Sequence, residues 1–417
     1  MITHFVPYPP NTGALQRNYN LLRQVALRHD VYLVTLTQKA LIPNEQALAD
    51  AIKKVSPYCK RIKVFPIPSD AHAVFYYLLL GCNLLSRKPY SAQWFFSRAM
   101  KKEIKKILHD VPIDLIHVDT VDLAGYVTDI TSIPKVLNHH NIESELLFRR
   151  ASHAKNVFMK WYLQMQTRKV RRFEKQMIPR FDKNIAVSSI DQAGISAMAM
   201  GKNAELVPNG TDTGYFSPSQ SAQDCELIFA GGLNWLPNAD AMIHFCTSIF
   251  PLIQKEAPEV IMNIIGTNPS AELKELSNKN KAIKVLGFVP DIRDHMARAS
   301  VHVVPLRIGG GTRLKILDAL AMGKAIVSTS IGAEGLDLTD GVDIMLADND
   351  ELFAKKVVLL LKNPELRKKM GEKGRETVEK KYSWTVIGPK LLEVYSRACG
   401  ENRHAETIPQ SPQRDDQ

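Results

Sequence analysis

The sequence has few cysteines, no cysteine pair at metal-ligand spacing and no long apolar run. Its five cysteines are scattered, without a Cys-x-x-Cys pair. An odd, unpatterned set argues against a disulfide framework or a zinc site and favours reduced thiols in a cytosol. No segment reaches the ~18–20 apolar residues that span a bilayer. Polar residues also interrupt any apolar stretch near the N-terminus, so neither a membrane span nor a signal peptide is expected.

Two common nucleotide-binding motifs are absent as well. Neither G-x-x-x-x-G-K-[ST] nor G-x-G-x-x-G occurs in the chain, which argues against a P-loop protein and an NAD-dependent dehydrogenase. The chain has 417 residues, of which 45% are hydrophobic and 23% are charged. This is the composition of a soluble globular protein with enough residues for two domains.

Short β-branched runs alternate with longer helical patterns along the whole chain. Such alternation predicts parallel sheets with helices on both faces. The strands are expected at Ile2–Val6, Val31–Leu36, Arg61–Phe65, Ile113–Val118, Lys135–Asn138, Asn184–Val187, Leu227–Ala230, Val260–Ile265, Ile283–Leu286, Val301–Val304, Ala325–Thr329 and Ile344–Leu346. The helices include Gly13–Arg28, Asn238–Glu256 and Pro364–Lys380, the last with Asn363 as N-cap.

The strand series restarts after the turn Val207–Asp212 and the polar stretch Ser217–Asp224. The sequence therefore predicts two doubly wound, Rossmann-like α/β domains of similar size, at 1–205 and 206–382, with a cleft between them. Ligands in such sheets bind at the carboxyl ends of the strands. Residues 401–417 are polar, contain two prolines and lack an apolar stripe, so this tail is expected to be disordered.

The most informative segment is Pro305–Lys324, in which a strand, three consecutive glycines and an amphipathic helix follow one another. Glycines allow a ligand close to the backbone, and the start of a helix offers unpaired N–H groups and a positive dipole end. Such a turn binds anions, most often phosphate. Asp318, on the helix, is suited to accept from ribose hydroxyls. The residues expected to hold a diphosphate here are Gly310, Gly311, Thr312, Arg313 and Lys315.

A tight turn with a solvated basic face would produce a similar pattern, so the turn alone leaves two interpretations open.

The chain carries 54 Lys and Arg against 43 Asp and Glu, a net charge of +11. Between Arg149 and Lys183 there are eleven basic residues against two acidic ones, interleaved with aromatic and Met side chains at near-helical spacing. The segment is either a membrane-surface helix attracted to anionic lipid, a domain helix with a solvated basic face, or a nucleic-acid-binding element. We expect an anionic membrane surface and no nucleic acid. The apolar run Ala73–Leu85 is either a buried or an interfacial helix.

With two such domains and this glycine turn, the chain resembles the retaining glycosyltransferases of family four, which have the GT-B fold. The resemblance extends over nearly residues 1–400. It rests on the order and spacing of seven segments, which are Pro7–Gly13 with Arg17, His139–Ser144, Val207–Asp212, Phe229–Asn234 with Pro237–Asn238, Gly287–Ile292, Ile331–Gly335 and Tyr382–Trp384. The glycine-rich variant is similar to bacterial sugar transferases of exopolysaccharide assembly, including those associated with PEP-CTERM systems. The family's two glutamates across the phosphate-loop helix are replaced by Gly310 and Asp318.

The resemblance implies a nucleoside-diphosphate sugar as donor and a lipid-linked or polysaccharide acceptor. The expected catalytic residues are His140, Arg313 and Lys315. The expected donor-binding residues are Gly13, Arg17, Gly232, Val289, Gly310, Gly311, Thr312, Asp318 and Glu334. Arg17 is otherwise a surface arginine, Glu334 otherwise a solvated loop acid, and Phe288 flanks the base or belongs to the core. Glu143 lies near His140 and could face the acceptor.

The resemblance also implies a front-face retaining route without a metal or other cofactor. Residues 383–400 are expected to form a helix that crosses back to the first domain. The expected location is the cytoplasm, peripherally at the inner face of the cell membrane. The alternatives are a UDP-sugar 2-epimerase of the same fold, whose expected carboxylates are not evident, and a non-enzymatic nucleotide- or membrane-binding scaffold.

Overall fold

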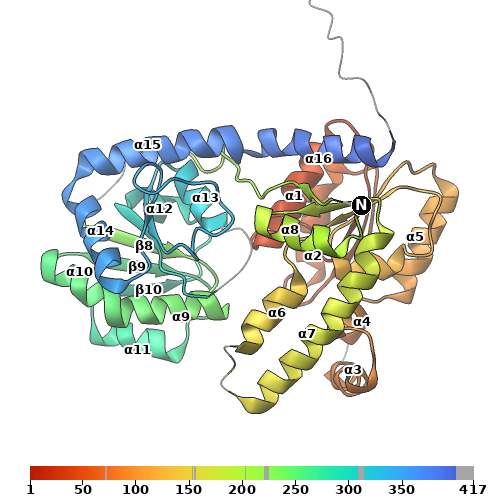
Figure 1. The fold of residues 1–417 in the computed structure, drawn as a ribbon, viewed down its shortest axis with the longest axis horizontal. Helices are drawn as coiled ribbons and strands as arrows, with labels where there is room; N and C mark the ends of the chain where they lie inside the picture. Colours follow the sequence, from red (N-terminus) through yellow and green to blue (C-terminus); the bar gives the residue numbers. More distant parts are fainter. Residues whose placement is uncertain are drawn as a thin grey trace, which may run out of the picture.

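The computed structural model describes residues 1–70, 73–152, 154, 156–201, 203–219, 225–308 and 314–400. It has two α/β domains, each built on one parallel sheet (Figure 1). This confirms the fold class predicted from the alternating pattern. The first sheet ends with Leu206, one residue past the expected boundary at 205, and the domain boundaries themselves stay predictions. The tail expected to be disordered, 401–417, lies outside the described residues.

The first sheet has the strand order β3-β2-β1-β4-β5-β6-β7. Every strand pair in it is parallel, so β1 is the point from which the chain winds in both directions. The crevice between β1 and β4 is where such sheets bind ligands. The strands are β1 (Ile2–Thr3), β2 (Tyr32–Thr37), β3 (Arg61–Pro66), β4 (Ile116–Val118), β5 (Lys135–Asn138), β6 (Lys183–Ala186) and β7 (Glu205–Leu206).

The second sheet repeats this arrangement with the order β10-β9-β8-β11-β12-β13, again all parallel. Its winding direction reverses between β8 and β11. The strands are β8 (Glu226–Ala230), β9 (Ile261–Ile265), β10 (Ile283–Gly287), β11 (Val301–Val304), β12 (Ala325–Ser328) and β13 (Met345–Leu346). Each sheet is buried between two hydrophobic clusters, one on each face, as expected of parallel sheets.

Helices cover both faces of each sheet (Figure 1). In the first domain they are α1 (Gly13–Ala26), α2 (Glu45–Val55), α3 (Ala73–Leu85), α4 (Tyr90–Trp94), α5 (Arg98–Asp110), α6 (Glu143–Ser152), α7 (Val157–Met177) and α8 (Ser189–Met198), with 3₁₀ turns η1 (Ser56–Tyr58), η2 (Pro68–Asp70), η3 (Val121–Tyr126) and η4 (Ile178–Arg180). In the second they are α9 (Leu236–His244), α10 (Phe250–Glu256), α11 (Ala271–Lys279), α12 (Arg293–Arg298), α13 (Leu314–Ala321), α14 (Asp350–Lys362) and α15 (Pro364–Lys381), and the last helix, α16 (Trp384–Ala398), follows α15.

The structure departs from the predicted elements in several places. The helix expected at Asn238–Glu256 is broken by a π-helical turn, η5 (Phe245–Ile249), because Pro251 has no N–H to continue the regular ladder. The first strand stops at Thr3, whose hydroxyl donates to the Phe5 carbonyl at 3.0 Å and bends the chain out of the sheet. The two-residue strand β7 was too short to be recognised. The N-cap at Asn363 is confirmed, since its side chain accepts from the Leu366 N–H at 3.0 Å.

Two segments connect the domains, and they run side by side. The linker after β7 forms a parallel bridge to the α15–α16 junction, between Thr211 and Ser383. A Cβ at Gly210 would lie 2.7 Å from the Tyr382 carbonyl oxygen. Beyond this crossing α16 packs on α1 of the first domain, where Gly388 lies against Gln24. The last helix therefore belongs to the core of the first domain.

Arg17 binds the linker from inside the protein. Its side chain is fully buried and donates at 2.9–3.2 Å to Asn138 Oδ1, Asn209 Oδ1 and the carbonyls of Val207 and Pro208. These bonds use the whole guanidinium fork. Burial lowers the pKa of Arg17 to about 10, although Asp119 opposes the shift. Arg17 is therefore not a surface arginine, because its donors bind the linker and Asn138, and its contact with the diphosphate stays a prediction.

We expect Arg17→Met to destabilise the protein by about 3–5 kcal/mol, because several buried acceptors and the nearby Asp119 lose their partner. Urea unfolding followed by circular dichroism measures this change. Arg23→Met is the matched control on the same helix, since Arg23 is partly exposed and pairs with Asp212 at 3.2 Å, a type of pair worth at most about 1 kcal/mol. Equal effects of the two substitutions would contradict the role given to Arg17.

Candidate active site

The site on the first domain lies at the carboxyl ends of β1, β4 and β5, beside the point where the sheet reverses. These ends carry His4, Asp119 and His140. Asp119 Oδ2 lies 2.5 Å from His4 Nδ1, and Asp119 Oδ1 lies 2.9 Å from His140 Nε2. The two imidazoles thus share one carboxylate, and both rings are mostly buried.

Asp119 is held as a carboxylate in the interior. It is 0% exposed and also accepts hydrogen bonds from Asn18 Nδ2 at 2.7 Å and Asn138 Nδ2 at 3.2 Å. Burial alone would raise the pKa of Asp119, but His140 and His4 outweigh it by charge and by hydrogen bonds, so the pKa lies well below its usual range. The buried negative charge fixes the orientation of His140.

The neighbouring histidine has a different environment. His139 is buried and its Nε2 lies 3.2 Å from Asn184 Oδ1 on β6. Burial lowers the pKa of His139 to about 4. Of the two histidines, only His140 therefore bonds to Asp119, and its catalytic role stays a prediction.

On the second domain Lys315 reaches from α13 to the turn after β8. Its Nζ donates to Asn238 Oδ1 at 2.7 Å and lies 4.2 Å from the centroid of the Phe229 ring. A Cβ at Gly231 would come within 2.7 Å of the lysine nitrogen. The lack of a side chain at Gly231 thus makes room for the cation. Gly232, the residue expected from the sequence, lies next in the turn, near Asn234 and Thr267.

The starts of α1 and α13 meet where the two domains adjoin. A Cβ at Gly13 would lie 3.3 Å from Leu314 Cδ1. One turn later, Asp318 Oδ1 accepts from Thr211 Oγ1 at 2.6 Å and from Gln16 Nε2 at 3.5 Å. Two helix N-termini with their positive dipole ends therefore face the same region, as a bound anion would require.

Glu334 and Val289 lie at the rim of this region. Glu334 Oε2 accepts from Arg149 of the first domain at 3.2 Å, so it spans the two domains. Val289 is half-buried against the core of the second domain. Phe288 beside it is 68% exposed, which answers the question left open by the sequence, since it does not belong to the core.

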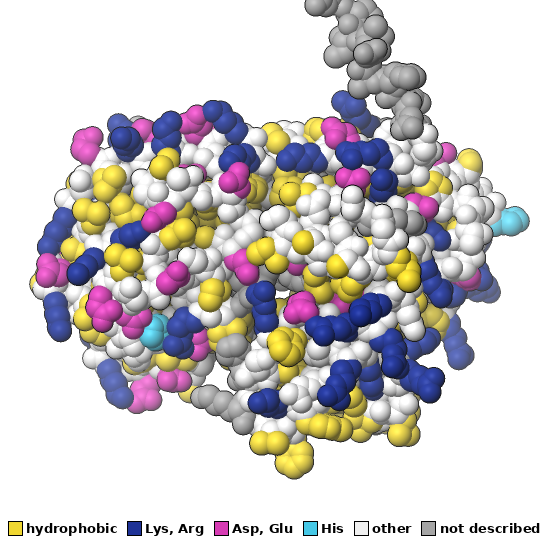
Figure 2. All heavy atoms as spheres, in the orientation of Figure 1, with side chains coloured by type: hydrophobic (Ala, Val, Ile, Leu, Met, Phe, Trp, Pro, Cys, Tyr) yellow, Lys and Arg dark blue, Asp and Glu magenta, His cyan; other side chains and the backbone are white. Residues whose placement is uncertain are grey.

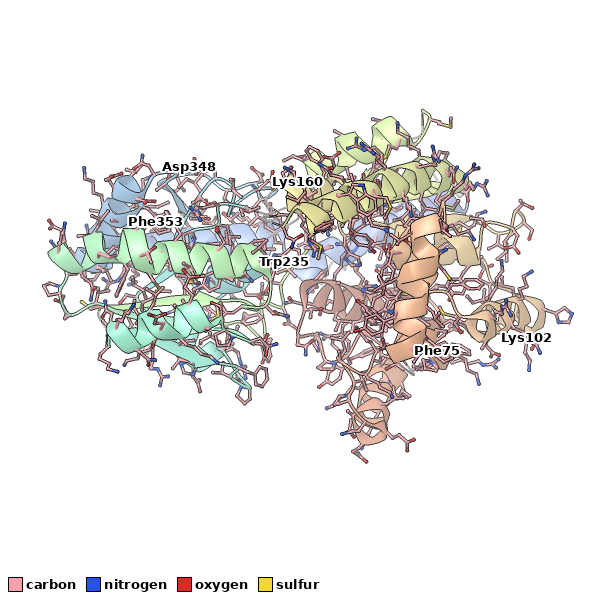
Figure 3. All side chains as sticks on the ribbon, turned by 90° about the horizontal axis from the view of Figure 1, so that it is seen from below. Phe75, Lys102, Lys160, Trp235, Asp348 and Phe353 are labelled. Carbon is pink, nitrogen blue, oxygen red and sulfur yellow. The ribbon has the colours of Figure 1, made fainter. Side chains whose placement is uncertain are left out.

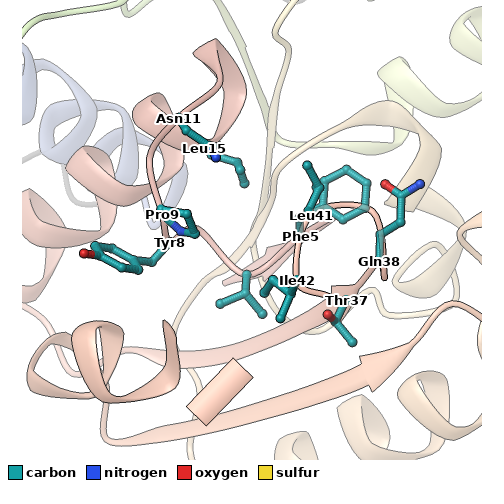
Figure 4. A pocket seen from close by; sticks show the side chains of 10 residues that line it. Phe5, Tyr8, Pro9, Asn11, Leu15, Thr37, Gln38, Leu41 and Ile42 are labelled. Atoms are coloured by element: carbon teal, nitrogen blue, oxygen red, sulfur yellow. The ribbon is translucent and has the colours of Figure 1, made fainter. Parts of the chain in front are cut away.

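Four of the predicted site residues, the donor-binding Gly310, Gly311 and Thr312 and the catalytic Arg313, lie outside the described residues, and their roles stay predictions. A small pocket beside the first loop (Figure 4) has a volume of about 10 Å³, room for about one water and not for a sugar. Glu143, at the start of α6, is surrounded by other acids, and burial together with Asp122 and Glu174 raises its pKa to about 8.

Sequence analysis missed His4, Asp119 and Asn238 as members of the site. Asp119 directly follows a predicted strand, so its place at a strand end could have been inferred. The partnership with His4 depends on β1 and β4 being neighbours, which the strand pattern does not reveal. The three groups His4, Asp119 and His140 have ligand atoms within 4.8 Å of one another and so could hold a metal ion. The expectation of a metal-free reaction remains a prediction.

Asp318 should make the stability of the protein depend on pH. Burial raises the pKa of Asp318 to about 7, so the folded state keeps a proton that the unfolded chain loses from about pH 4. The free energy of unfolding should therefore fall as pH rises from about 4 to about 7, by about 2–4 kcal/mol. In Asp318→Asn, thermal unfolding between pH 4 and pH 8 should lack most of this fall. Asp50→Asn, exposed on α2, is the control and should keep it; the same pH profile in both variants would contradict the assignment.

Both domains of the chain are similar to known proteins. Residues 12–215 match the family model "Glycosyltransferase Family 4" and residues 224–363 match "Glycosyl transferases group 1". A Klebsiella pneumoniae protein described as an uncharacterized 44.6 kDa protein in the cps region is 29% identical over 150 residues, which are 34% of this chain and 38% of that protein. A phosphatidyl-myo-inositol mannosyltransferase of Mycobacterium tuberculosis is 24% identical over 216 residues, 48% of this chain and 56% of the relative.

The chain thus spans about half the length of these relatives or less. Among solved structures, Anabaena HepE in complex with UDP-glucose superposes with a TM-score of 0.66 over 95% of this chain and 98% of HepE, at 14% identity. At that identity the likeness concerns the fold. The two matched family models together cover the first domain and most of the second, and the chain belongs to glycosyltransferase family four, with the GT-B fold.

Proposed function

We propose that this protein transfers a sugar from a nucleoside-diphosphate sugar to a lipid-linked or glycan acceptor, with retention at the anomeric carbon and without a metal. One observation carries the proposal. The turn after β8, to which Lys315 reaches from α13, and the His140–Asp119 pair of the first domain both lie at strand ends where their sheets reverse, the position at which such folds bind ligands.

The donor diphosphate would bind where the two helix starts meet. Lys315 supplies a positive charge beside the side-chain-free Gly231, and the first turns of α1 and α13 supply the positive ends of their dipoles. Arg313 and the backbone at Gly310, Gly311 and Thr312 would complete this cradle. Preorganised positive groups stabilise a leaving diphosphate in the same manner as a bound cation. Asp318 and Glu334 are the acids proposed to accept from ribose and sugar hydroxyls.

The sugar would contact His140. Its Nε2 is held by Asp119, which positions the ring. Asp119 itself accepts from four side chains and is closed to solvent, so it is not available as a covalent nucleophile. A front-face route, in which the acceptor hydroxyl attacks from the side of the leaving group, fits this arrangement.

The relatives support the choice of substrates. One is named for mannosyl transfer to phosphatidyl-myo-inositol, and a solved protein of the same fold holds UDP-glucose. A nucleotide sugar and a lipid-linked or glycan acceptor are therefore proposed here, with exopolysaccharide assembly as the setting suggested by the cps-region relative. The glycosyltransferase family models favour this proposal over an epimerase or a scaffold.

We also propose that the protein binds the inner face of the cell membrane through the basic stretch 149–183. Among the described residues no helix combines the length and the apolarity needed to cross a bilayer. Basic side chains line the exposed side of α7, and the side chains at the start of this helix are apolar and exposed (Figure 2). Phe158 is 84% exposed and Trp161 is 57% exposed. Basic side chains beside exposed apolar ones suit a membrane surface, where the charges bind anionic lipid headgroups and the apolar side chains enter the layer beneath them.

Two substitutions should separate donor binding from chemistry. Lys315→Met keeps the aliphatic stem and should weaken binding of one of UDP, GDP or ADP by about tenfold to hundredfold, since one charge-assisted bond is lost. His140→Ala should leave that affinity unchanged but lower donor turnover with acceptor by about a hundredfold or more. Calorimetry without divalent metal measures the first change, and release of the nucleoside diphosphate measures the second. Lys369→Ala, exposed on α15, is the charge-matched control. If no diphosphate binds the wild type, the transferase proposal is wrong.

Membrane binding should depend on the charge of α7. Arg172→Glu with Lys175→Glu should weaken binding to vesicles containing phosphatidylglycerol at least tenfold, because each basic residue contributes about 1 kcal/mol near an anionic surface. Sedimentation with these vesicles, and with vesicles of phosphatidylcholine alone, measures the change. Lys368→Glu with Lys369→Glu on α15, at the opposite end of the molecule (Figure 1), makes the same charge change and should bind like the wild type. An equal loss in both variants would indicate a general charge effect.

A further inference from the structure

The first domain holds a second, larger cavity that the proposed chemistry does not use. It lies between η2, α3 and the segment of α4 that leads to α5, and its volume is about 250 Å³. This is slightly below the range of whole small-molecule sites, so it suits part of a ligand. Its lining is mostly aromatic and aliphatic and carries no charged side chain; the lining residues are Pro68, Ser69, Phe75, Leu79, Gln93, Trp94 and Phe96.

Two polar atoms of this lining have no partner. Ser69 Oγ and Trp94 Nε1 are buried and make no hydrogen bond within the described part of the chain. Ser69 is 8% exposed. Both atoms lie beneath the apolar lining, out of reach of a water in the cavity, so the surface that the cavity presents is mostly apolar. The cavity therefore fits a largely apolar ligand.

A row of aromatic rings connects this cavity to the candidate active site. The Trp94 and Phe95 ring centroids are 4.8 Å apart, and Phe95 lies 6.0 Å from His4. His4 in turn lies 5.7 Å from His140. Phe95 and His4 therefore connect the cavity wall to the histidine proposed to contact the sugar.

The exposed side of α3, which covers the cavity, is apolar and lies beside the basic helix α7. Leu78 on α3 is 56% exposed and Leu85 is 93% exposed. The end of α3 is fixed to α7, since Lys169 Nζ donates to the Asn83 carbonyl and Gln166 Nε2 to Asn83 Oδ1, both at 2.6 Å. Viewed from below, α3 with Phe75 and the start of α7 with Lys160 lie on the same face of the molecule (Figure 3).

We propose that this cavity binds the hydrocarbon chain of a lipid-linked acceptor, next to its headgroup. The apolar lining selects a hydrocarbon, the neighbouring basic side chains of α7 complement an anionic headgroup, and the aromatic row leads from the chain to His140. The assignment of this lipid as acceptor rests on the transferase function proposed above. Hydrocarbon binding in the cavity does not.

Photolabelling tests the site directly. The full-length protein is irradiated with decanol carrying a mid-chain diazirine, and the labelled residues are mapped by mass spectrometry. We expect the label within residues 68–96 on side chains that line the cavity. Leu79→Trp, which fills the cavity with an equally apolar side chain, should reduce that label at least fivefold. Leu78→Trp makes the same change one residue earlier, on the exposed side of α3, and should keep it.

The wild-type map decides the question even if Leu79→Trp does not fold. Labels confined to exposed apolar positions such as Leu85 and Phe158, or equal labelling of both variants, would overturn the cavity site and indicate adsorption to the apolar surface. The same samples are titrated with UDP, GDP and ADP. Nucleotide binding without cavity labelling would overturn this inference alone. Cavity labelling without any nucleotide binding would overturn the transferase proposal and, with it, the acceptor assignment.

Discussion

One buried hydrogen-bond chain connects the domain linker to the candidate catalytic histidines. Arg17 binds the linker carbonyls and Asn138 Oδ1, Asn138 Nδ2 donates to Asp119, and Asp119 holds His4 and His140. Because Arg17 lies one turn after Gly13, the same side chain fixes where the start of α1 faces α13. A movement of the linker that breaks these bonds would disturb both the anion-binding region and the histidine pair. The charge of Arg17 is retained in the interior because acceptors satisfy its whole fork and Asp119 lies near.

The parts of this fold that follow from local pattern were predictable. Strands buried on both faces include continuous apolar runs, such as Leu227–Ala230, which Gly231 follows directly. The contacts that make the site are set by strand order. Asp119 meets His4 because β1 and β4 are neighbours, although 115 residues separate the two side chains. No periodicity carries that information. The same holds for Arg17, whose linker partners lie about 190 residues away.

The α3 helix shows a different limit of sequence reasoning. Its run of apolar residues is nearly uniform around the helix, and such a helix is normally buried. Here one side covers the cavity while much of the rest remains exposed, because no further element of the described chain packs over it. An apolar helix without a cover is unfavourable in water. Its stability is easier to understand if a lipid surface covers it, which is why the exposed face of α3 and the basic face of α7 are best considered together.

The electrostatics of the two half-sites complement each other for glycosyl transfer. On the second domain the cation of Lys315 is held by Asn238 and the Phe229 ring, where it would stabilise negative charge on a departing diphosphate. On the first domain the buried carboxylate of Asp119 lies behind His140, where it would favour positive charge near the sugar. Breaking the bond between a sugar and a diphosphate separates charge in this same sense, positive on the sugar and negative on the phosphate. Two fixed charges of opposite sign, one on each domain, therefore stabilise the transition state more than the intact donor, in which the bond has not yet separated charge. They act together only when both domains contact one donor.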